Sequence, residues 1–299
     1  MARSFVKRAF ETGLLHLGPA AYGRARHRDR TLVLAYHNIL PRGEAPVGDR
    51  SLHLPQDLFG AQLDALVAEC EVVPLTEALL QREPSEGRPR VAITFDDAYA
   101  GALEVGVEEL VRRNLPATMF VAPGILGGRT LWWDATGGDG KLRDRVLSEG
   151  HGHPDVARQM WIAGGGTWVE TPDYARSGSA ASVARFAALK GMSLGAHGWL
   201  HLNLATAASA ARDRELRAPL DWFEEQALQV QPVLAYPFGL YSRDVPDAVR
   251  AVGYESALRV DGGWLPSLQR GTAFEEPRLN VAAGLSTRGF RLRLAGLFR

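Results

Sequence analysis

The feature that most constrains the fold of this chain is a regular alternation of short apolar runs with amphipathic segments. Runs of five or six largely apolar residues, typical of strands buried on both faces, occur at 31–36, 71–75, 91–95, 117–122, 192–196, 232–236 and 255–260. Segments whose apolar positions recur every three or four residues, which predicts helices, occur at 55–70, 101–114, 208–228 and 243–254. Alternating strands and helices indicate an α/β fold, a parallel sheet covered by helices.

Length and composition are consistent with one large domain. The chain has 299 residues, a hydrophobic fraction of 46%, and 34 basic residues balanced by 34 acidic ones, so no nucleic-acid or acidic partner is indicated. The single cysteine, Cys70, excludes an intrachain disulfide and a multi-cysteine zinc site. Any metal must therefore be held by histidine and carboxylate side chains.

The first 30 residues form a basic N-terminal extension, and residues 31–299 form the expected domain. Glu11 and His16 interrupt the apolar stretch that a signal peptide would need, and we find no run long enough to span a membrane. We therefore expect a cytoplasmic protein.

Residues 125–190 form a long insertion before the fifth strand with no clear strand of their own. Such a length without regular elements is unusual in a compact domain, so we expect one or two helices in a functional insertion. The "HGHPD" motif places His151, His153 and Asp155 close together, either as a rival metal cluster or as a solvated loop. We favour the loop because no strand end presents these side chains.

Polar and turn-forming residues follow four of the expected strands. His37 follows the first strand, Asp96 and Asp97 follow "VAITF", His197 follows "MSLGA", and Pro237-Phe238-Gly239 follows "PVLAY". Because parallel strands deliver their C-terminal ends to one rim, these groups should gather there. Two adjacent carboxylates must repel, share a proton or hold a cation between them, unless they only cap a solvated turn.

His197 and His201 are four residues apart, which on one helical turn points both imidazoles to the same side. Together with one carboxylate they would make three ligands, and the open fourth position is typical of a catalytic zinc site. The alternative is two histidines satisfied by ordinary hydrogen bonds. The second aspartate could then act as a general base for water, but the residues alone do not decide which aspartate has which role.

The ordered motifs "LAYHNI", "TFDDAYA", "HGWLH" with Leu204, "YPFG" and "PRLNV" resemble the polysaccharide deacetylase family, also known as carbohydrate esterase family 4 or the NodB homology domain. The resemblance covers about residues 31–295 and extends to the bacterial branch of exopolysaccharide biosynthesis. It implies a distorted (β/α) barrel of about seven parallel strands. It also implies a metal-dependent hydrolase that removes acetyl groups from N-acetylated sugars of a polysaccharide or lipid-linked saccharide.

The resemblance also implies roles for individual residues. Asp96 would be the catalytic base, and Asp97, His197 and His201 would hold a divalent metal, zinc in the first place, with cobalt, nickel or manganese as alternatives. The Phe238 backbone N–H would stabilise the oxyanion. The candidates for contacting the sugar are Tyr236, Pro237, Trp199 and Trp133.

Three departures from the family pattern stand out. Gly198 replaces the usual Ser or Thr, and Ala235 stands where an Arg often orients the base; Arg278 could replace that Arg, or be a surface residue. The late Leu-x-His motif that supplies the general acid is missing. Either His37 or Asp96 itself would then protonate the leaving amine.

Two other functions remain open at this point. One is removal of O-acetyl groups, which needs less help from an acid; the other is a weakly active carbohydrate-binding pseudoenzyme within a polysaccharide assembly complex. The basic extension and the tail "RGFRLRLAGLFR" could be interfacial helices that allow peripheral membrane contact, or amphipathic caps on the barrel. The expected partner in each case is an acetylated saccharide.

Overall fold

The computed structural model describes residues 10–15, 18–80, 87–265 and 273–297. Its centre is a curved, all-parallel sheet in the order β10-β1-β5-β6-β7-β8-β9, with β4 paired to one end of β5. The strands are β1 (Thr31–Tyr36), β4 (Glu71–Val72), β5 (Arg90–Phe95), β6 (Ala117–Val121), β7 (Met192–Ala196), β8 (Val230–Ala235), β9 (Ser256–Leu258) and β10 (Leu279–Asn280). A separate pair is formed by β2 (Asn38–Leu40) and β3 (His53–Pro55).

The predicted barrel of parallel strands is confirmed, with one exchange of strands. All seven expected strands form, but β4 is only two residues long and lies off the main path, since Pro74 follows it and α4 (Leu75–Leu80) begins at once. The seventh place in the sheet is taken by β10, which was not predicted. Two residues directly after the "PR" of Pro277-Arg278 carry too little periodicity to be recognised in the sequence.

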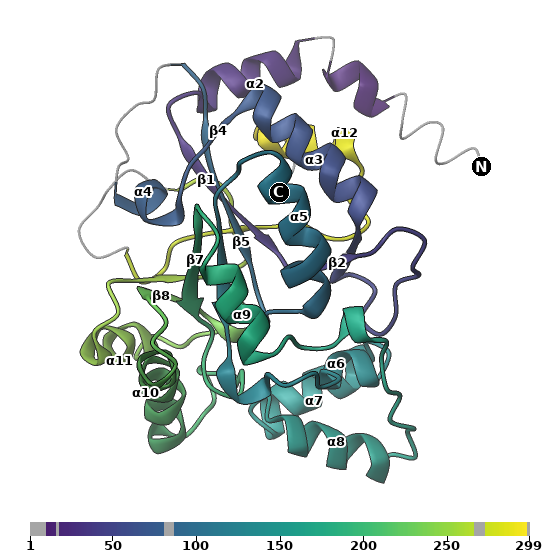
Figure 1. Cartoon of the computed structure of the whole chain (residues 1–299), viewed down its shortest axis with the longest axis vertical. Helices are drawn as coiled ribbons and strands as arrows, with labels where there is room; N and C mark the ends of the chain where they lie inside the picture. Colours follow the sequence, from purple (N-terminus) through teal and green to yellow (C-terminus); the bar gives the residue numbers. More distant parts are fainter. Residues whose placement is uncertain (1–9, 16–17, 81–86, 266–272, 298–299) are drawn as a thin grey trace.

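Helices cover the outside of the sheet (Figure 1). They are α3 (Gln56–Glu69), η1 (Ala102–Gly106) continuing into α5 (Val107–Arg112), α9 (Ala180–Ala187), α10 (Ser209–Glu225) and α11 (Val245–Val252). In α3, the buried Phe59, Leu63 and Leu66 follow the three- to four-residue spacing, so one face packs on the sheet.

The segment 273–280 closes the barrel. Its first part bonds to β9, with Glu276 N–H donating to the Ala257 carbonyl and Arg278 N–H to the Arg259 carbonyl. Its second part, β10, pairs with β1 at Leu34 and Ala35. One stretch of chain therefore bridges the two edges of the curved sheet.

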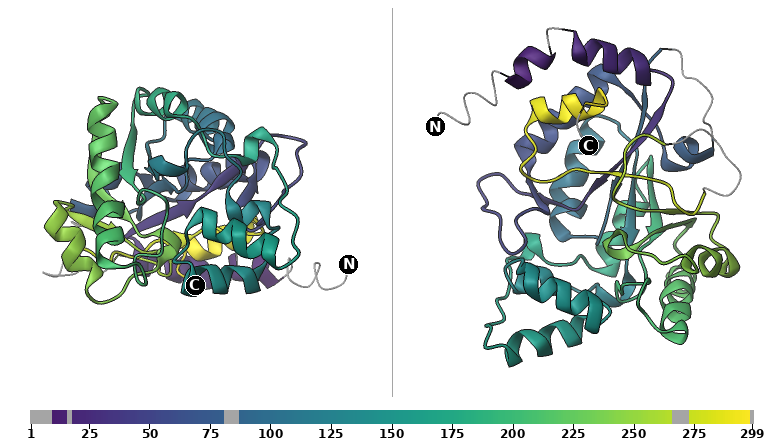
Figure 2. Two further views of the ribbon diagram at one scale, coloured as in Figure 1. Left: turned by 90° about the horizontal axis from the view of Figure 1, so that it is seen from below. Right: turned by 180° about the vertical axis from the view of Figure 1, so that it is seen from behind.

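The insertion contains more helices than expected. Residues 125–190 hold α6 (Trp132–Ala135), α7 (Gly140–Glu149), α8 (Pro154–Ala163) and α9, where we expected one or two helices. Three of these helices begin at a side-chain cap: α7 at Asp139, α8 at His153, and α9 at Ser179, which forms a capping box. These caps allow short helices to form where apolar periodicity is weak. Helices α6, α7 and α8 lie at the opposite end of the molecule from α2 and α12 (Figures 1 and 2).

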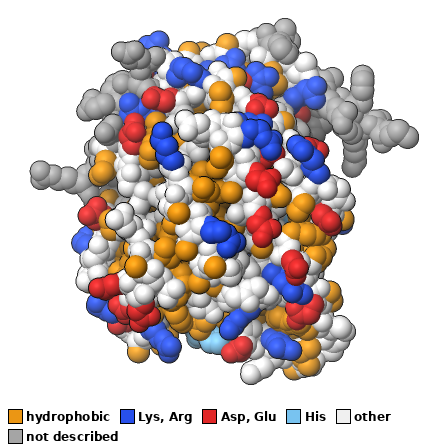
Figure 3. Space-filling view, in the orientation of Figure 1, with side chains coloured by type: hydrophobic (Ala, Val, Ile, Leu, Met, Phe, Trp, Pro, Cys, Tyr) orange, Lys and Arg blue, Asp and Glu red, His pale blue; other side chains and the backbone are white. Residues whose placement is uncertain are grey.

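The two basic ends of the chain meet at the far end of the barrel. Helix α2 (Pro19–His27) packs beside α12 (Thr287–Leu294), whose Phe290, Leu292 and Leu294 are buried, as the cap interpretation requires. Of the expected extension, residues 1–9 and 16–17 lie outside the described residues. Among the helices described, none combines the length and apolar character that crossing a bilayer needs. Acidic and basic side chains are interspersed over the face in Figure 3.

Candidate active site

The C-terminal ends of the strands bring the candidate residues together. Asp96 and Asp97 follow β5, and His197 follows β7. The first residue beyond each strand is still fixed by the neighbouring strand, since Asp96 N–H donates to the Tyr36 carbonyl and His197 N–H to the Val121 carbonyl. The rim of a parallel sheet therefore places these side chains with the rigidity of the sheet itself.

Asp97, His197 and His201 form a compact, buried triangle of ligand atoms. Asp97 Oδ1 lies 3.2 Å from His201 Nε2 and 3.5 Å from His197 Nε2, and the two Nε2 atoms are 3.1 Å apart. A tetrahedral ion with bonds of about 2.0–2.1 Å would separate its ligand atoms by about 3.3 Å. The three residues thus make a possible metal site.

The electrostatics of this triangle also fit a cation. Burial raises the pKa of Asp97 well above its usual value, and the Asp96 charge raises it further. Burial lowers the pKa of His197 and lowers that of His201 strongly. Asp97 Oδ1 and His201 Nδ1 have no hydrogen-bond partner within the described residues. A cation among these groups would favour the charged carboxylate and satisfy its oxygen.

His197 is oriented by the backbone of β8. Its Nδ1 lies 2.8 Å from the Ala235 carbonyl oxygen, which can only accept, so Nδ1 carries the proton. The lone pair of Nε2 then faces the triangle. Such a carbonyl contact is the usual way in which a metal-ligating histidine is held in one tautomer.

The loop between the two histidines is held by Glu215 of α10. Its buried carboxylate accepts backbone N–H bonds from Trp199, Leu200 and Leu202 at 3.0–3.1 Å. Burial raises the pKa of Glu215, although these N–H groups lower it. The sequence analysis did not select Glu215. The only indication in the sequence was an acidic residue on the apolar face of a predicted helix.

The loop itself is not the helical turn that the four-residue spacing suggested. Gly198 has φ +76°, and His201 has φ +61°. A Cβ at Gly198 would lie 2.8 Å from the Glu215 carboxylate. The glycine that departs from the family pattern therefore suits a left-handed position with no room for a side chain.

Asp96 is paired with Arg278, which comes from the closing segment. The guanidinium donates to both carboxylate oxygens, at 2.7 and 2.8 Å, and to Thr94 Oγ1 at 3.1 Å. Arg278 is 0% exposed, so the surface-residue alternative is wrong. Burial alone would raise the pKa of Asp96, but Arg278, together with His197 and His37, outweighs burial and holds the pKa well below the usual value. Asp96 is thus an ionised carboxylate whose Oδ2 lies 3.9 Å from His197 Nε2.

Left-handed backbone is concentrated at this site. Four of the seven described non-glycine residues with positive φ are Asp97, Ala98, His201 and Phe238. Each such residue costs about 1–3 kcal/mol and persists only where its surroundings fix it. The concentration of strain here is typical of a functional site.

A cavity of about 130 Å³ opens onto the triangle. It is lined by Asp96, Asp97 and both histidines, with Phe238 and Trp133 among its walls. The Phe238 and Trp133 rings lie 4.3 and 5.0 Å from the His201 ring. Trp133 is anchored by a buried chain of hydrogen bonds, from its Nε1 to Tyr99 and from Tyr99 to Asp134, each 2.7 Å long. Asp134, which the sequence analysis did not select, also binds His53 of β3.

His37 also lines this cavity, but its electrostatics oppose the role expected of it. Burial lowers the pKa of His37 to about 4, although the Asp96 charge raises it. At neutral pH its imidazole is therefore neutral, and it would have to take up a proton before it could act as a general acid. The assignment of His37 as the general acid stays a prediction, without support from its charge state.

Other expected residues lie away from the cavity. Tyr236 is fully buried, stacks on Tyr241, and donates its hydroxyl to the Phe274 carbonyl; Pro237 is buried beside it. Trp199 packs against Gly124 and lines no part of the cavity. Their contact with substrate stays a prediction.

The "HGHPD" residues do not form a metal cluster. His153 caps α8 by accepting the Asp155 N–H, and His151 bonds to Thr206. Within the described part of the chain, the Asp97–His197–His201 group is the one cluster with metal-ligand spacing.

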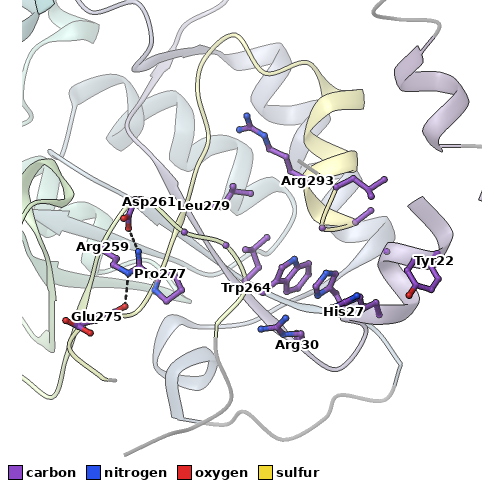
Figure 4. A pocket seen from close by; sticks show the side chains of 18 of the residues that line it. Tyr22, His27, Arg30, Arg259, Asp261, Trp264, Glu275, Pro277, Leu279 and Arg293 are labelled. Atoms are coloured by element: carbon purple, nitrogen blue, oxygen red, sulfur yellow. Dashed lines mark hydrogen bonds and ion pairs between the residues drawn. The ribbon is translucent and has the colours of Figure 1, made fainter. Parts of the chain in front are cut away.

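A larger cavity, of about 800 Å³, lies at the opposite end of β1, between α2, α12 and the loop after β9 (Figure 4). Trp264 stacks on His27 there, with ring centroids 4.6 Å apart. Arg30 already binds the Leu265 carbonyl, and Arg259 already binds Asp261. None of Asp97, His197 and His201 lines this cavity, so we do not regard the larger cavity as the active site.

The site thus combines an ionised carboxylate with a possible metal site at the rim of an α/β barrel. This combination is typical of hydrolytic enzymes. The family model described as polysaccharide deacetylase matches residues 83–257, more than half of the chain. The chain therefore belongs to the polysaccharide deacetylase family and is a deacetylase enzyme, which confirms the resemblance seen in its motifs. Its substrate class is acetylated polysaccharide.

Solved structures agree in fold. The Streptococcus pyogenes deacetylase PplD, in complex with acetate, is 17% identical, with a TM-score of 0.61 and coverage of 89% of this chain and 98% of PplD. IcaB from Ammonifex degensii is 19% identical, with a TM-score of 0.59 and coverage of 89% and 97%. A de-N-acetylase from Aggregatibacter actinomycetemcomitans is 14% identical, with a TM-score of 0.58 and coverage of 88% and 99%. A search of curated proteins gave no match.

Proposed function

We propose that this enzyme is a metal-dependent hydrolase that removes acetyl groups from N-acetylated sugars of a polysaccharide or lipid-linked saccharide. The proposal is supported by the ligand triangle, by the ionised Asp96 beside it, and by a neighbour in fold that is itself described as a de-N-acetylase. The observation that carries most weight is the 3.1–3.5 Å spacing of the three ligand atoms.

Asp97, His197 and His201 would hold the divalent ion, with zinc as our first choice because two imidazoles and one carboxylate are a common zinc donor set. When bound, such an ion supplies a Lewis acid for the acetyl carbonyl and for the attacking water. The Ala235 carbonyl and Glu215 keep the two imidazoles in position for it.

Side chains of the protein itself accept and donate the proton in the reaction. Asp96 takes a proton from the water that attacks the acetyl carbon, and Arg278 orients Asp96 and keeps it charged beforehand. The Phe238 N–H, held in a strained turn at φ +57°, would donate to the developing oxyanion. The C–N bond breaks as the amine nitrogen takes up a proton. Asp96, protonated in the first step, is the better donor, since His37 is neutral.

The decisive test measures acetate release from matched substrates. The full-length protein is treated with a chelator, reloaded with zinc, and incubated with oligosaccharides that carry either N-acetyl or O-acetyl groups on the same sugar. We expect acetate from the N-acetylated substrate, and only from the metal-loaded enzyme.

Each other result has a definite meaning. Release from the O-acetylated substrate alone would make the enzyme an O-deacetylase. Equal release before and after chelation, with metal absence verified by elemental analysis, would remove the metal from the proposal. Saccharide binding without any acetate release would indicate a binding role instead.

A further inference from the structure

The catalytic cavity is too small to hold a saccharide chain. Its volume is about 130 Å³, whereas pockets that enclose a small ligand usually measure about 300–1,000 Å³. It can take an acetyl group and part of its sugar. The other units of a polymer then lie outside this cavity.

A second cavity, of about 500 Å³, lies directly behind one wall of the first. Trp132 and Trp133 line both cavities, so the two cavities share these indoles as part of their walls. Trp133 is also the residue whose ring contacts His201. The second cavity is formed by residues 124–133, the start of α8 and residues 168–170. All of its lining except Leu200 therefore lies between β6 and the end of the insertion.

The lining of this second cavity has the chemistry that recognises sugars. The Trp168 indole is partly exposed, and the Arg158 guanidinium stacks over one face of it, 5.2 Å from the ring centroid, so that only the other face can pack against a ligand. Such a face packs against the C–H side of a sugar ring, while planar polar groups bind its hydroxyls.

The polar groups around Trp168 are held in place. The Glu170 carboxylate accepts from Trp168 Nε1 at 3.2 Å and from Thr130 Oγ1 at 2.7 Å, which fixes the indole relative to the cavity. Arg129 and His153 add donors along the same lining. These fixed polar groups and the indole together suit a sugar ring, whose hydroxyls need polar partners and whose C–H side needs an apolar face.

We propose that this cavity is a saccharide subsite of the enzyme, in which Trp168 and Arg158 hold a sugar unit of the same chain that is deacetylated at the neighbouring triangle. This inference rests on the proposed function, because it assigns a site for the polymer that the enzyme acts on. The insertion is thereby given a role in selecting chains over single sugars.

The test compares substrates of different length. Acetate release is measured for an N-acetylated hexosamine monomer and for oligomers of two to six units, with wild type, Trp168→Ala, Trp168→Phe and Arg158→Ala. We expect wild type to prefer the oligomers. Trp168→Ala should raise KM for the longer oligomers about tenfold, as truncating an aromatic anchor does, with little change in kcat. Trp168→Phe should retain most of the affinity.

The matched control is Arg145→Ala, an exposed arginine of α7 outside the cavity, which should behave as wild type. Monomer turnover shows that each variant is folded and catalytic. An unchanged KM for the oligomers in Trp168→Ala and Arg158→Ala, with active wild type, would overturn the subsite and leave the proposed function intact. Wild type without activity on any length would instead count against the proposed function, and oligomer binding measured by calorimetry would then test the subsite alone.

Discussion

Glu215→Gln is the most informative single substitution, because it keeps the shape of the side chain and removes its charge. Three backbone N–H groups of the histidine loop donate to this buried carboxylate. Hydrogen bonds to a charged acceptor contribute about 1.5–3 kcal/mol each, against about 0.5–1.5 kcal/mol for neutral ones. Over three donors, the free energy of unfolding should fall by about 3 kcal/mol, which corresponds to about 6–12 °C in Tm.

The same substitution should weaken zinc binding about 10- to 100-fold, because the loop that orients His201 loosens. Thermal melts followed by circular dichroism and zinc competition with a chromogenic chelator measure the two effects. Glu224→Gln, an exposed position on the same helix, is the control and should change neither. A Glu215→Gln protein with wild-type Tm and wild-type zinc affinity would refute the view that this carboxylate holds the loop.

Four further outcomes follow from the geometry of the site. Asp97→Ala and His201→Ala should each abolish zinc binding, and added chelator should then lower the Tm of wild type but not of these variants. Asp96→Asn should keep zinc and lose about 10²–10⁴-fold in acetate release; retained turnover would take the role of base away from Asp96. Arg278→Gln should lower the free energy of unfolding by about 3–5 kcal/mol in urea denaturation, since a buried carboxylate loses its counter-ion; a loss below about 1 kcal/mol would contradict this. Gly198→Ala should lower both Tm and zinc affinity, because its Cβ meets Glu215; wild-type values would mean that the loop adapts.

The barrel and the position of the triangle were predictable because both depend on local signals. Each long strand is recognisable in the sequence as an apolar run. Asp96, Asp97 and His197 follow directly after such runs. The shared direction of parallel strands then brings these residues together without any knowledge of loop structure. His201 was found through its spacing from His197, although the backbone between them is left-handed rather than helical.

The supporting residues were only partly predictable, because their partners are distant in sequence. Arg278 was named as a possible partner of the base but left open against a surface position, and Glu215 was not selected at all. Arg278 reaches Asp96 only through the closing segment, and Glu215 reaches the histidine loop only through the packing of α10. Nothing in the residues next to them shows that they are buried. Trp168 lies in a stretch without periodicity, where the sequence gives no indication of which side chains line a cavity.

The closing segment has one more consequence. The segment that completes the hydrogen bonding around the barrel also supplies Arg278, the counter-ion of the proposed base Asp96. A nascent chain not yet extended through residues 273–280, or a molecule in which this segment has detached, would lack the Arg278 guanidinium that keeps Asp96 charged. We therefore expect hydrolytic competence to appear only after residues 273–280 have been synthesised and have bonded to β9 and β1, as a result of topology and without any separate switch.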